Sequence, residues 1–239
     1  MKERGILFSD EMVRALLDGR KTQTRRAVKL REFQVTTTPG YDFIFRDRRL
    51  LWNDYRTADL IAKVCPYGKV GDRLWVRETW APFYAGGNSL AHPQPDMHEA
   101  NAIRYRATPD HVTAYPTSIS TWETRPTSKK DHVWRPSIFM PRWASRITLD
   151  VTEVRVQRLQ DISEDDARAE GCPSMIESLA GLSHLRGAEA ARAVPSHITT
   201  PREEYALLWE RINGDGSWDA NPWVWAITFK RVEAASRAA

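Results

Sequence analysis

The sequence predicts an α+β fold in which a small barrel or curled sheet is flanked by helices and interrupted by long irregular insertions. Strand-like and helix-like segments are mixed, but they do not alternate regularly enough for a doubly wound sheet. The longest strand segment, 145–159, loses its alternation near Thr152, as a bulge or sharp bend would cause. Residues 81–141 hold eight of the fourteen prolines, which is typical of an irregular insertion.

The N-terminal residues predict a strand followed by a helix. Residues 6–8 form a short apolar segment, and Ser9 or Asp10 is suited to cap a helix over 10–18. Gly19 stands where a C-terminal glycine would end that helix. The apolar stripe of the helix consists of Met12, Val13, Leu16 and Leu17.

Residues 32–64 form a first insertion, with a predicted strand at 43–45 and a short helix at 54–63. A Gly-Asp turn then precedes a predicted strand over 73–80. Leu74 and Val76 lie on one face of this strand; Arg73, Trp75, Arg77 and Thr79 lie on the other.

The second insertion, 81–141, contains one predicted strand at 103–106. After the long strand, Ser163 is placed to cap a helix that ends near Gly171. A Thr-Pro-Arg-Glu start predicts a further helix over 200–213, because it combines a threonine cap, a proline in the first turn and a glutamate three residues after the cap.

The last predicted element is a strand over 223–232, with alternate aromatic and aliphatic residues on one face. We therefore expect a single domain over 1–232, with its insertions at about 32–64 and 81–141, and a polar tail at 233–239. A hydrophobic content of 41% supports a packed core.

The charge pattern predicts an anionic ligand near the N-terminus. The chain as a whole is mildly basic, with a net charge of +4, which is less than a DNA-wrapping protein would need. Residues 1–31 alone carry nine Lys or Arg and four acids, a net charge of +5.

Other classes of protein are disfavoured. Cys65 and Cys172 fit no metal or redox spacing and indicate two buried thiols in a cytosolic protein. The charged N-terminus and the lack of a long apolar run predict no signal peptide, no membrane partner and a cytoplasmic location. His92, His98, His111 and His132 match no common zinc spacing, so we expect no metal and no cofactor.

The segment from Gly19 to Arg26, Gly-Arg-Lys-Thr-Gln-Thr-Arg-Arg, carries the most chemical information. A lysine three residues before a threonine indicates either a nucleophile beside a base or an anion clamp. Both interpretations favour a polar, nucleotide-like ligand. A solvated basic turn is the structural alternative.

This pattern, Gly19-x-Lys21-x-x-Thr24-x-Arg26 after a strand and a helix, resembles the signature of ASCH domains in the PUA-like superfamily. The later elements occur in a similar order. The sequence Lys-Thr-Gln-Thr-Arg-Arg is similar to the motif of the longer ASCH proteins of phages and prophages. The resemblance covers 1–30, 66–80, 142–172 and 200–232. It implies a small β-barrel whose cleft accepts a nucleobase, a nucleoside or RNA.

A threonine at position 24, where the family often has an acid, resembles the branch of amidohydrolases that deacetylate N4-acetylcytidine. That branch uses a lysine, a threonine and a glutamate. Lys21 and Thr24 match through the signature, and Glu170 matches through the helix that starts at Ser163. This chain is much longer than that branch, so its insertions would reshape the cleft.

Each of these groups would have a defined role in amide hydrolysis. Thr24 would be the nucleophile and Lys21 its base, if burial and the charges of Arg25 and Arg26 lower the lysine pKa. Glu170 would orient the lysine or pass a proton to the leaving nitrogen. Lys21 must then lie on the turn that leaves the helix, because on a plain strand it would point away from Thr24.

Further substrate-binding candidates surround this set. Trp75, Arg77, Glu78 and Trp80 could stack on a base and bond its edge, or could form core and a surface ion pair. Arg142 could contact phosphate, although an exposed arginine at a strand entrance is the favoured interpretation. The full predicted binding set is Gly19, Arg25, Arg26, Trp75, Arg77, Glu78, Trp80 and Arg142.

Two functions from different classes follow. One is an amidohydrolase acting on an N-acylated pyrimidine, free or within nucleic acid. The other is a non-catalytic protein that binds single-stranded nucleic acid, either RNA or modified phage DNA. A ribonuclease is a third alternative, disfavoured because no histidine pair for acid–base cleavage is evident.

Overall fold

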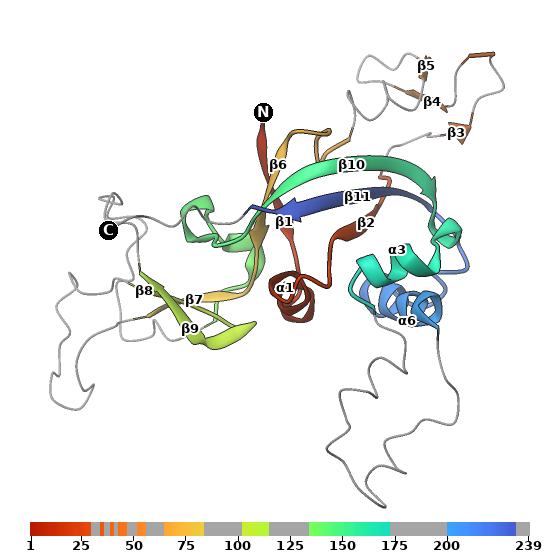
Figure 1. The fold of residues 1–239 in the computed structure, drawn as a ribbon. Coiled ribbons are helices and arrows are strands. Elements are labelled where there is room, and N and C mark those ends of the chain that lie inside the picture. Colours follow the sequence, from red (N-terminus) through yellow and green to blue (C-terminus); the bar gives the residue numbers. More distant parts are fainter. Residues whose placement is uncertain are drawn as a thin grey trace, which may run out of the picture.

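The computed structural model describes residues 1–29, 34–35, 39–40, 43–46, 52–55, 65–83, 102–114, 134–172 and 200–232. Figure 1 shows a curved five-stranded sheet with one helix, α1 (Asp10–Leu17), beneath its concave side. The fold is therefore mixed α+β, as predicted.

The central sheet has the order β1-β6-β10-β11-β2. Its strands are β1 (Glu3–Leu7), β2 (Gln23–Ala27), β6 (Arg73–Arg77), β10 (Thr148–Arg158) and β11 (Trp223–Arg231). β1 pairs with β6 in parallel, and the other neighbours are antiparallel. The register of β10 against β11 shifts between Val151 and Glu153, which confirms the predicted bulge. Strands β1 and β2 are the sheet edges, so a closed barrel is not shown.

The core lies between α1 and the concave face of this sheet. Ser9 caps α1 by accepting a hydrogen bond from the Met12 N–H, as the sequence predicted. Val13 and Leu16 are almost fully buried against the sheet. Burial of each such side chain stabilises the fold by roughly 1.5–3 kcal/mol, which fixes the end of α1 and the motif that follows it.

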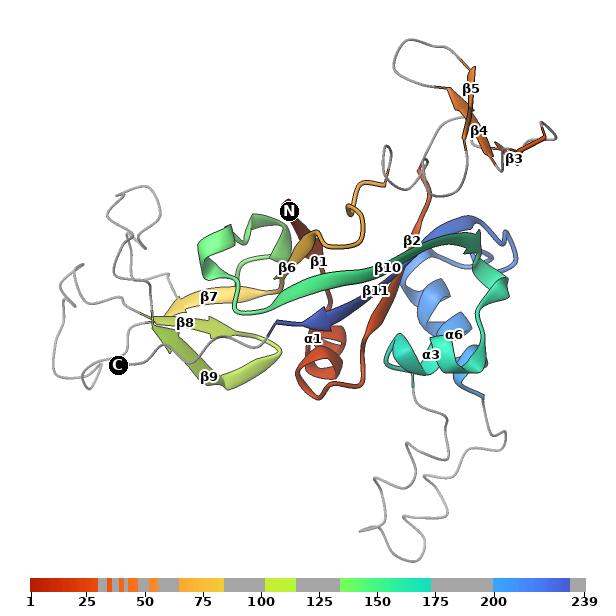
Figure 2. The same ribbon diagram turned by 45° about the horizontal axis from the view of Figure 1, so that its top comes forward.

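Two further helices pack together at one end of the sheet (Figures 1 and 2). α3 (Glu164–Ala169) is capped by Ser163, and α6 (Pro201–Asn213) begins with the predicted capping box between Thr200 and Glu203. Gly214, with a φ of 97°, follows the last helical residue. Both helix predictions are confirmed.

The predicted strand over 73–80 is wrong in one respect, because it is divided between two sheets. β6 ends at Arg77, and β7 (Trp80–Phe83) pairs with β8 (Ala102–Tyr105), which pairs with β9 (Thr108–Ala114). The break lies at Glu78, a fully buried carboxylate held by both ends of the Arg146 guanidinium at 3.0 and 2.8 Å. This second sheet lies at the end of the central sheet opposite α3 and α6 (Figure 2).

The insertions are thus less irregular than predicted. In the first, β3 (Gln34–Val35), β4 (Phe43–Arg46) and β5 (Trp52–Tyr55) form an antiparallel sheet. The strand at 43–45 is confirmed, whereas the helix expected from 54 is replaced by a strand at 54–55. The remainder of that predicted helix, 56–63, and the predicted polar tail at 233–239 lie outside the described residues.

The described residues also include three short 3₁₀ helices: η2 (Ser137–Phe139), η3 (Arg142–Ala144) and η4 (Leu159–Asp161). The long strand therefore begins at 148 rather than 145. Within the described ranges, every helix is too short or too polar to cross a bilayer.

The turn before β6 gives the fold an acid-sensitive contact. Asp72 accepts hydrogen bonds from the Lys2 N–H at 2.8 Å and from Arg4 Nη1 at 2.9 Å. The hydrogen bond from the Lys2 N–H has the largest effect, and together these contacts lower the pKa of Asp72 from 3.8 to about 2. Because the folded pKa lies below the unfolded one, this stabilisation is complete above pH 3.8 and is lost as pH falls through about 2.

We therefore expect the free energy of unfolding of the Asp72→Asn variant to depend less on pH than that of the wild type between pH 4 and 2. Urea unfolding of both proteins across this range measures the difference. Parallel pH profiles would show that the contact contributes nothing.

Candidate functional site

The motif crosses from α1 to β2 over the end of α3. Gly19, with a φ of 75°, ends α1, and Lys21 lies between that helix and β2, as predicted. The Lys21 N–H donates to the Ala15 carbonyl at 3.0 Å, and the Thr22 N–H donates to the Ala169 carbonyl at 2.8 Å. Two backbone hydrogen bonds thus hold this connection against two helices.

Lys21 and Glu170 form a buried pair, although 149 positions separate them in the sequence. Lys21 Nζ donates to Glu170 Oε2 at 2.8 Å and to the Glu170 carbonyl at 2.7 Å. The two residues are only 2% and 3% exposed. Glu170 is the C-terminal cap of α3, where the helix dipole also favours a cation.

Burial lowers the pKa of Lys21 below its usual 10.5, against the opposing effect of the Glu170 carboxylate. A neutral amine has two N–H groups and one lone pair. The two oxygens of Glu170 take up both N–H groups. The lone pair of a neutral Lys21 is then available to accept a proton, which is what a general base requires.

Arg25 holds Glu170 from the other side. Arg25 Nη1 donates to Glu170 Oε1 at 3.2 Å, and Nη2 donates to Asp166 Oδ2 at 2.6 Å. Burial alone would raise the pKa of Asp166, but the hydrogen bond from Arg155 and the charge of Arg25 lower it. The guanidinium of Arg25 therefore positions the carboxylate of Glu170, and its predicted contact with substrate stays a prediction.

Thr24 lines a small pocket beside this cluster. Glu170, Tyr205 and Arg26 line the same pocket, which has a volume of about 180 Å³ and is called the Thr24 pocket below. Thr24 is 1% exposed, and its hydroxyl has no hydrogen-bond partner within the described part of the chain. The other lining residues are Met12, Arg25, Ala27, Lys29, Tyr67, Leu208, Trp209, Ile212 and Asn213.

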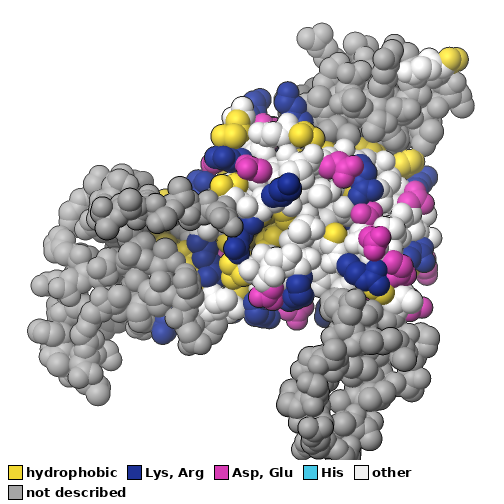
Figure 3. All heavy atoms as spheres, viewed as in Figure 1, with side chains coloured by type: hydrophobic (Ala, Val, Ile, Leu, Met, Phe, Trp, Pro, Cys, Tyr) yellow, Lys and Arg dark blue, Asp and Glu magenta, His cyan; other side chains and the backbone are white. Residues whose placement is uncertain are grey.

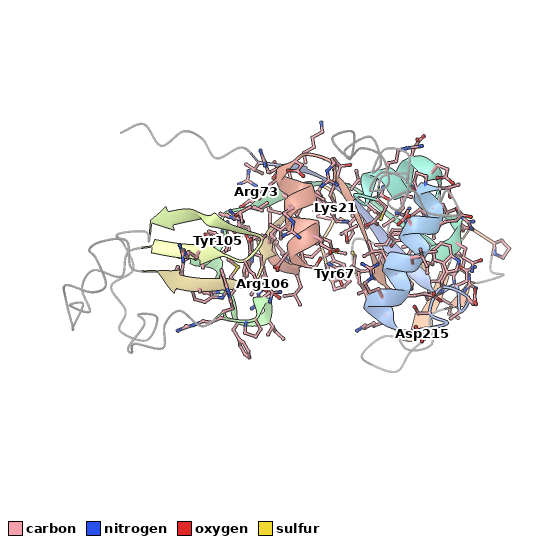
Figure 4. All side chains as sticks on the ribbon, turned by 90° about the horizontal axis from the view of Figure 1, so that it is seen from below. Lys21, Tyr67, Arg73, Tyr105, Arg106 and Asp215 are labelled. Carbon is pink, nitrogen blue, oxygen red and sulfur yellow. The ribbon has the colours of Figure 1, made fainter. Side chains whose placement is uncertain are left out.

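A second pocket, of about 460 Å³, adjoins the first through Met12, Glu170 and Leu208, which line both. It is called the Cys172 pocket below. Residues of α1 and α6 line both pockets, and Figure 4 shows Lys21 and Tyr67 between these two helices. Tyr67 lines the Thr24 pocket, whereas the Lys21 side chain is buried and lines neither pocket. The remaining residues that line the Cys172 pocket are Glu11, Arg14, Ala15, Asp18, Arg20, Gly171, Cys172, Glu204 and Arg211.

Tyr205 belongs to the site but was predicted only as part of the apolar stripe of α6. It is 3% exposed, and its ring packs against Arg25, whose guanidinium carbon lies 5.8 Å from the ring centroid. Burial, followed by the charge of Glu170, raises the pKa of the Tyr205 phenol well above 10. A tyrosine in a helical stripe looks like core in the sequence, so no local signal distinguishes it.

The other predicted binding residues lie elsewhere. Trp75, Arg77 and Arg142 are at the β6 side of the sheet, and β10 and β11 separate them from β2. The guanidinium carbons of Arg77 and Arg142 lie 5.2 and 6.0 Å from the Trp75 ring centroid. Arg142 is also paired with Glu3 at 2.9 Å and is 43% exposed, which fits the favoured interpretation of an exposed arginine.

Glu78 and Trp80 are buried away from the Thr24 pocket. The alternative in which Glu78 pairs with Arg77 at the surface is wrong, because Arg146 binds the buried Glu78 carboxylate. Trp80 is 3% exposed and stacks edge-on against Trp143 in a separate core cluster. Neither side chain reaches the Thr24 pocket.

Gly171 keeps the site compact and yields a testable prediction. Its φ is 91°, and an added Cβ would lie 3.1 Å from the Ala15 Cβ and 3.4 Å from the Lys21 Cβ. We expect Gly171→Ala to destabilise the protein by about 1–3 kcal/mol through backbone strain and to displace Lys21. Thermal unfolding measures the first effect. Gly216→Ala is a control for strain alone, since its φ is 74° and its Cβ would meet nothing within 4 Å.

The two cysteines are free and buried, as predicted. Burial raises the pKa of Cys65 to about 11 and that of Cys172 to about 12, so neither is a thiolate at neutral pH. Within the described ranges, no three His, Cys, Asp or Glu side chains are placed to hold a metal ion.

No family model matches the chain, and comparisons with curated proteins and with solved structures found no match. The resemblance to ASCH domains therefore stays a prediction.

Proposed function

We propose that this protein is an ASCH-type amidohydrolase that removes an acyl group from an N-acylated pyrimidine such as N4-acetylcytidine. The observation that carries the proposal is the buried Lys21–Glu170 pair, which lies beside a pocket lined by Thr24 and Glu170. The fold adds support. The Arg26 side chain on β2 donates to the Leu7 carbonyl on β1, so a side-chain contact bridges the two edge strands of the curled sheet. Phe8, which follows β1, packs edge-on against Phe229 of β11.

In this mechanism, Lys21 rests as the ammonium paired with Glu170 and reacts as the neutral amine that remains once a proton has been lost to water. That amine removes the proton from the Thr24 hydroxyl as its oxygen attacks the acyl carbon. The tetrahedral intermediate collapses, the exocyclic nitrogen of the base leaves, and Lys21 returns the proton to it. A water molecule then hydrolyses the acyl-threonine: Lys21 takes a proton from the attacking water and returns it to the Thr24 oxygen as the carboxylic acid leaves. Glu170 keeps the amine oriented throughout by accepting both of its N–H groups.

The size of the pocket favours a small ligand. At about 180 Å³, the Thr24 pocket is smaller than the ~300–1,000 Å³ of sites for drug-sized ligands. It suits one planar ring with a short acyl group. Figure 3 shows Lys and Arg interspersed with acidic residues on the face in view, without a broad basic surface for a polymer. The two free cysteines agree with a cytoplasmic site of action.

The test is acetate release from N4-acetylcytidine by the wild-type protein, followed by chromatography of the cytidine formed. We expect equal amounts of the two products and little effect of salt on the rate. The nucleic-acid-binding alternative predicts no release and an affinity for single-stranded oligonucleotides that falls steeply as salt rises. That outcome would replace the amidohydrolase proposal.

A further inference from the structure

Part of the positive charge that lines the Thr24 pocket has no ion-pair partner among the residues that the structure describes. The two interior cations, Lys21 and Arg25, are both paired with carboxylates. Arg26 and Lys29 also line the pocket, but neither forms an ion pair with another residue of the described ranges. Uncompensated cations at the wall of a small pocket attract an anionic ligand group.

This charge lies at one end of the pocket. Thr24 and Arg26 are two residues apart on β2, so they share a face and their Cα atoms are roughly 7 Å apart. Lys29 lies just beyond the end of that strand and is exposed. An anionic group bound there would be offset from the Thr24 hydroxyl along the strand.

The Cys172 pocket differs in charge. It is lined by both signs, and its Asp18 and Arg20 pair with each other at 2.9 Å. Its carboxylates are Glu11, Asp18, Glu170 and Glu204, and its arginines are Arg14, Arg20 and Arg211. A strand of nucleic acid running through both pockets would bring phosphates next to these carboxylates. The charge pattern therefore favours a ligand with one phosphate at the Arg26 end.

We propose that the substrate is an acylated nucleoside monophosphate, whose phosphate is bound by Arg26 and Lys29. This inference rests on the amidohydrolase function proposed above and specifies its substrate class. A guanidinium gives directed hydrogen bonds to phosphate oxygens, and the mobile ammonium of Lys29 adds a point charge. Arg26 is already oriented, because it donates to the Leu7 carbonyl and its guanidinium carbon lies 5.4 Å from the Phe8 ring centroid.

Calorimetric titration with cytidine and with cytidine 5′-monophosphate tests the inference without turnover. We expect the wild type to bind the monophosphate roughly tenfold more tightly, as one charge-assisted hydrogen bond would provide. Lys29→Gln should reduce this ratio several-fold, and added salt should reduce it in the wild type. Lys230→Gln, an exposed lysine at the far end of β11, should leave it unchanged.

Equal affinity for the two ligands, no binding of the monophosphate, or an unchanged ratio in Lys29→Gln would overturn the phosphate site. The hydrolysis assay gives a separate result. Turnover of N4-acetylcytidine without a monophosphate preference would retain the enzyme and reject the phosphate site. A monophosphate preference without any turnover would retain the phosphate site and reject the hydrolase.

Discussion

Replacing Thr24 by alanine is expected to lower kcat for N-acyl hydrolysis by ~10⁴-fold, with the KM little changed, because the nucleophile is removed. The hydroxyl makes no hydrogen bond within the described part of the chain, so the fold does not depend on it. The deleted atoms are few, and the midpoint of urea unfolding should therefore stay close to that of the wild type. Steady-state kinetics and urea unfolding of the same preparation measure both effects.

The motif supplies a matched control two residues away. Thr22 is exposed, whereas Thr24 is buried against the pocket. Both threonines lie in the same Lys-Thr-Gln-Thr segment, so Thr22→Ala makes an identical chemical change outside the pocket. We expect Thr22→Ala to retain wild-type kcat. Equal loss in both variants would assign the effect to the backbone of the segment rather than to a nucleophile.

Replacing Lys21 by methionine is expected to remove about 3 kcal/mol from the free energy of unfolding, because it leaves Glu170 buried with one cation fewer. Arg25 still contacts that carboxylate at 3.2 Å, which keeps the loss at the lower end of the range for broken buried pairs. The side-chain volume is nearly retained, so the effect reports charge rather than packing. Urea unfolding at neutral pH measures it.

A double variant, Lys21→Met with Glu170→Gln, separates the ion pair from other causes. If the unpaired charge is responsible, the double variant should lose less stability than the sum of the two single variants. Lys230→Met, at an exposed position, should change the free energy of unfolding by less than ~0.5 kcal/mol. Strict additivity of the two buried substitutions would contradict the pairing.

Much of the fold could be predicted because its signals are local. The caps at Ser9, Ser163 and Thr200 are side-chain contacts within one helical turn, and they fixed three helix starts. The bulge near Glu153 is visible as a slip in alternation within one strand. Neither kind of signal depends on distant residues.

The failures have non-local causes. The break between β6 and β7 depends on Glu78 binding Arg146, which is 68 residues away, so the alternation over 73–80 continued past it. Trp80 had the composition of a binding surface, but its partners Ile103 and Met140 bury it. The alternation of residues along a strand indicates which face of the strand a residue occupies. It does not indicate what covers that face.

The candidate site was predictable only in part. The spacing of Lys21 and Thr24 marked them as a pair, but it did not point to Glu170, which only the family resemblance suggested. The structure brings Lys21 and Glu170 into contact and places Thr24 and Glu170 on the same pocket. Tyr205 lines the same pocket because α6 packs against α3, and that packing is not visible in the sequence.

We propose that Lys21, Thr24 and Glu170 together hydrolyse an N-acylated pyrimidine. Initial rates on N4-acetylcytidine and related N-acyl nucleosides and nucleotides, with wild type beside Lys21→Ala, Thr24→Ala and Glu170→Ala, test it most directly. We expect turnover by the wild type and its loss in each of the three variants. No turnover by the wild type on any substrate, or undiminished turnover by Thr24→Ala, would contradict it.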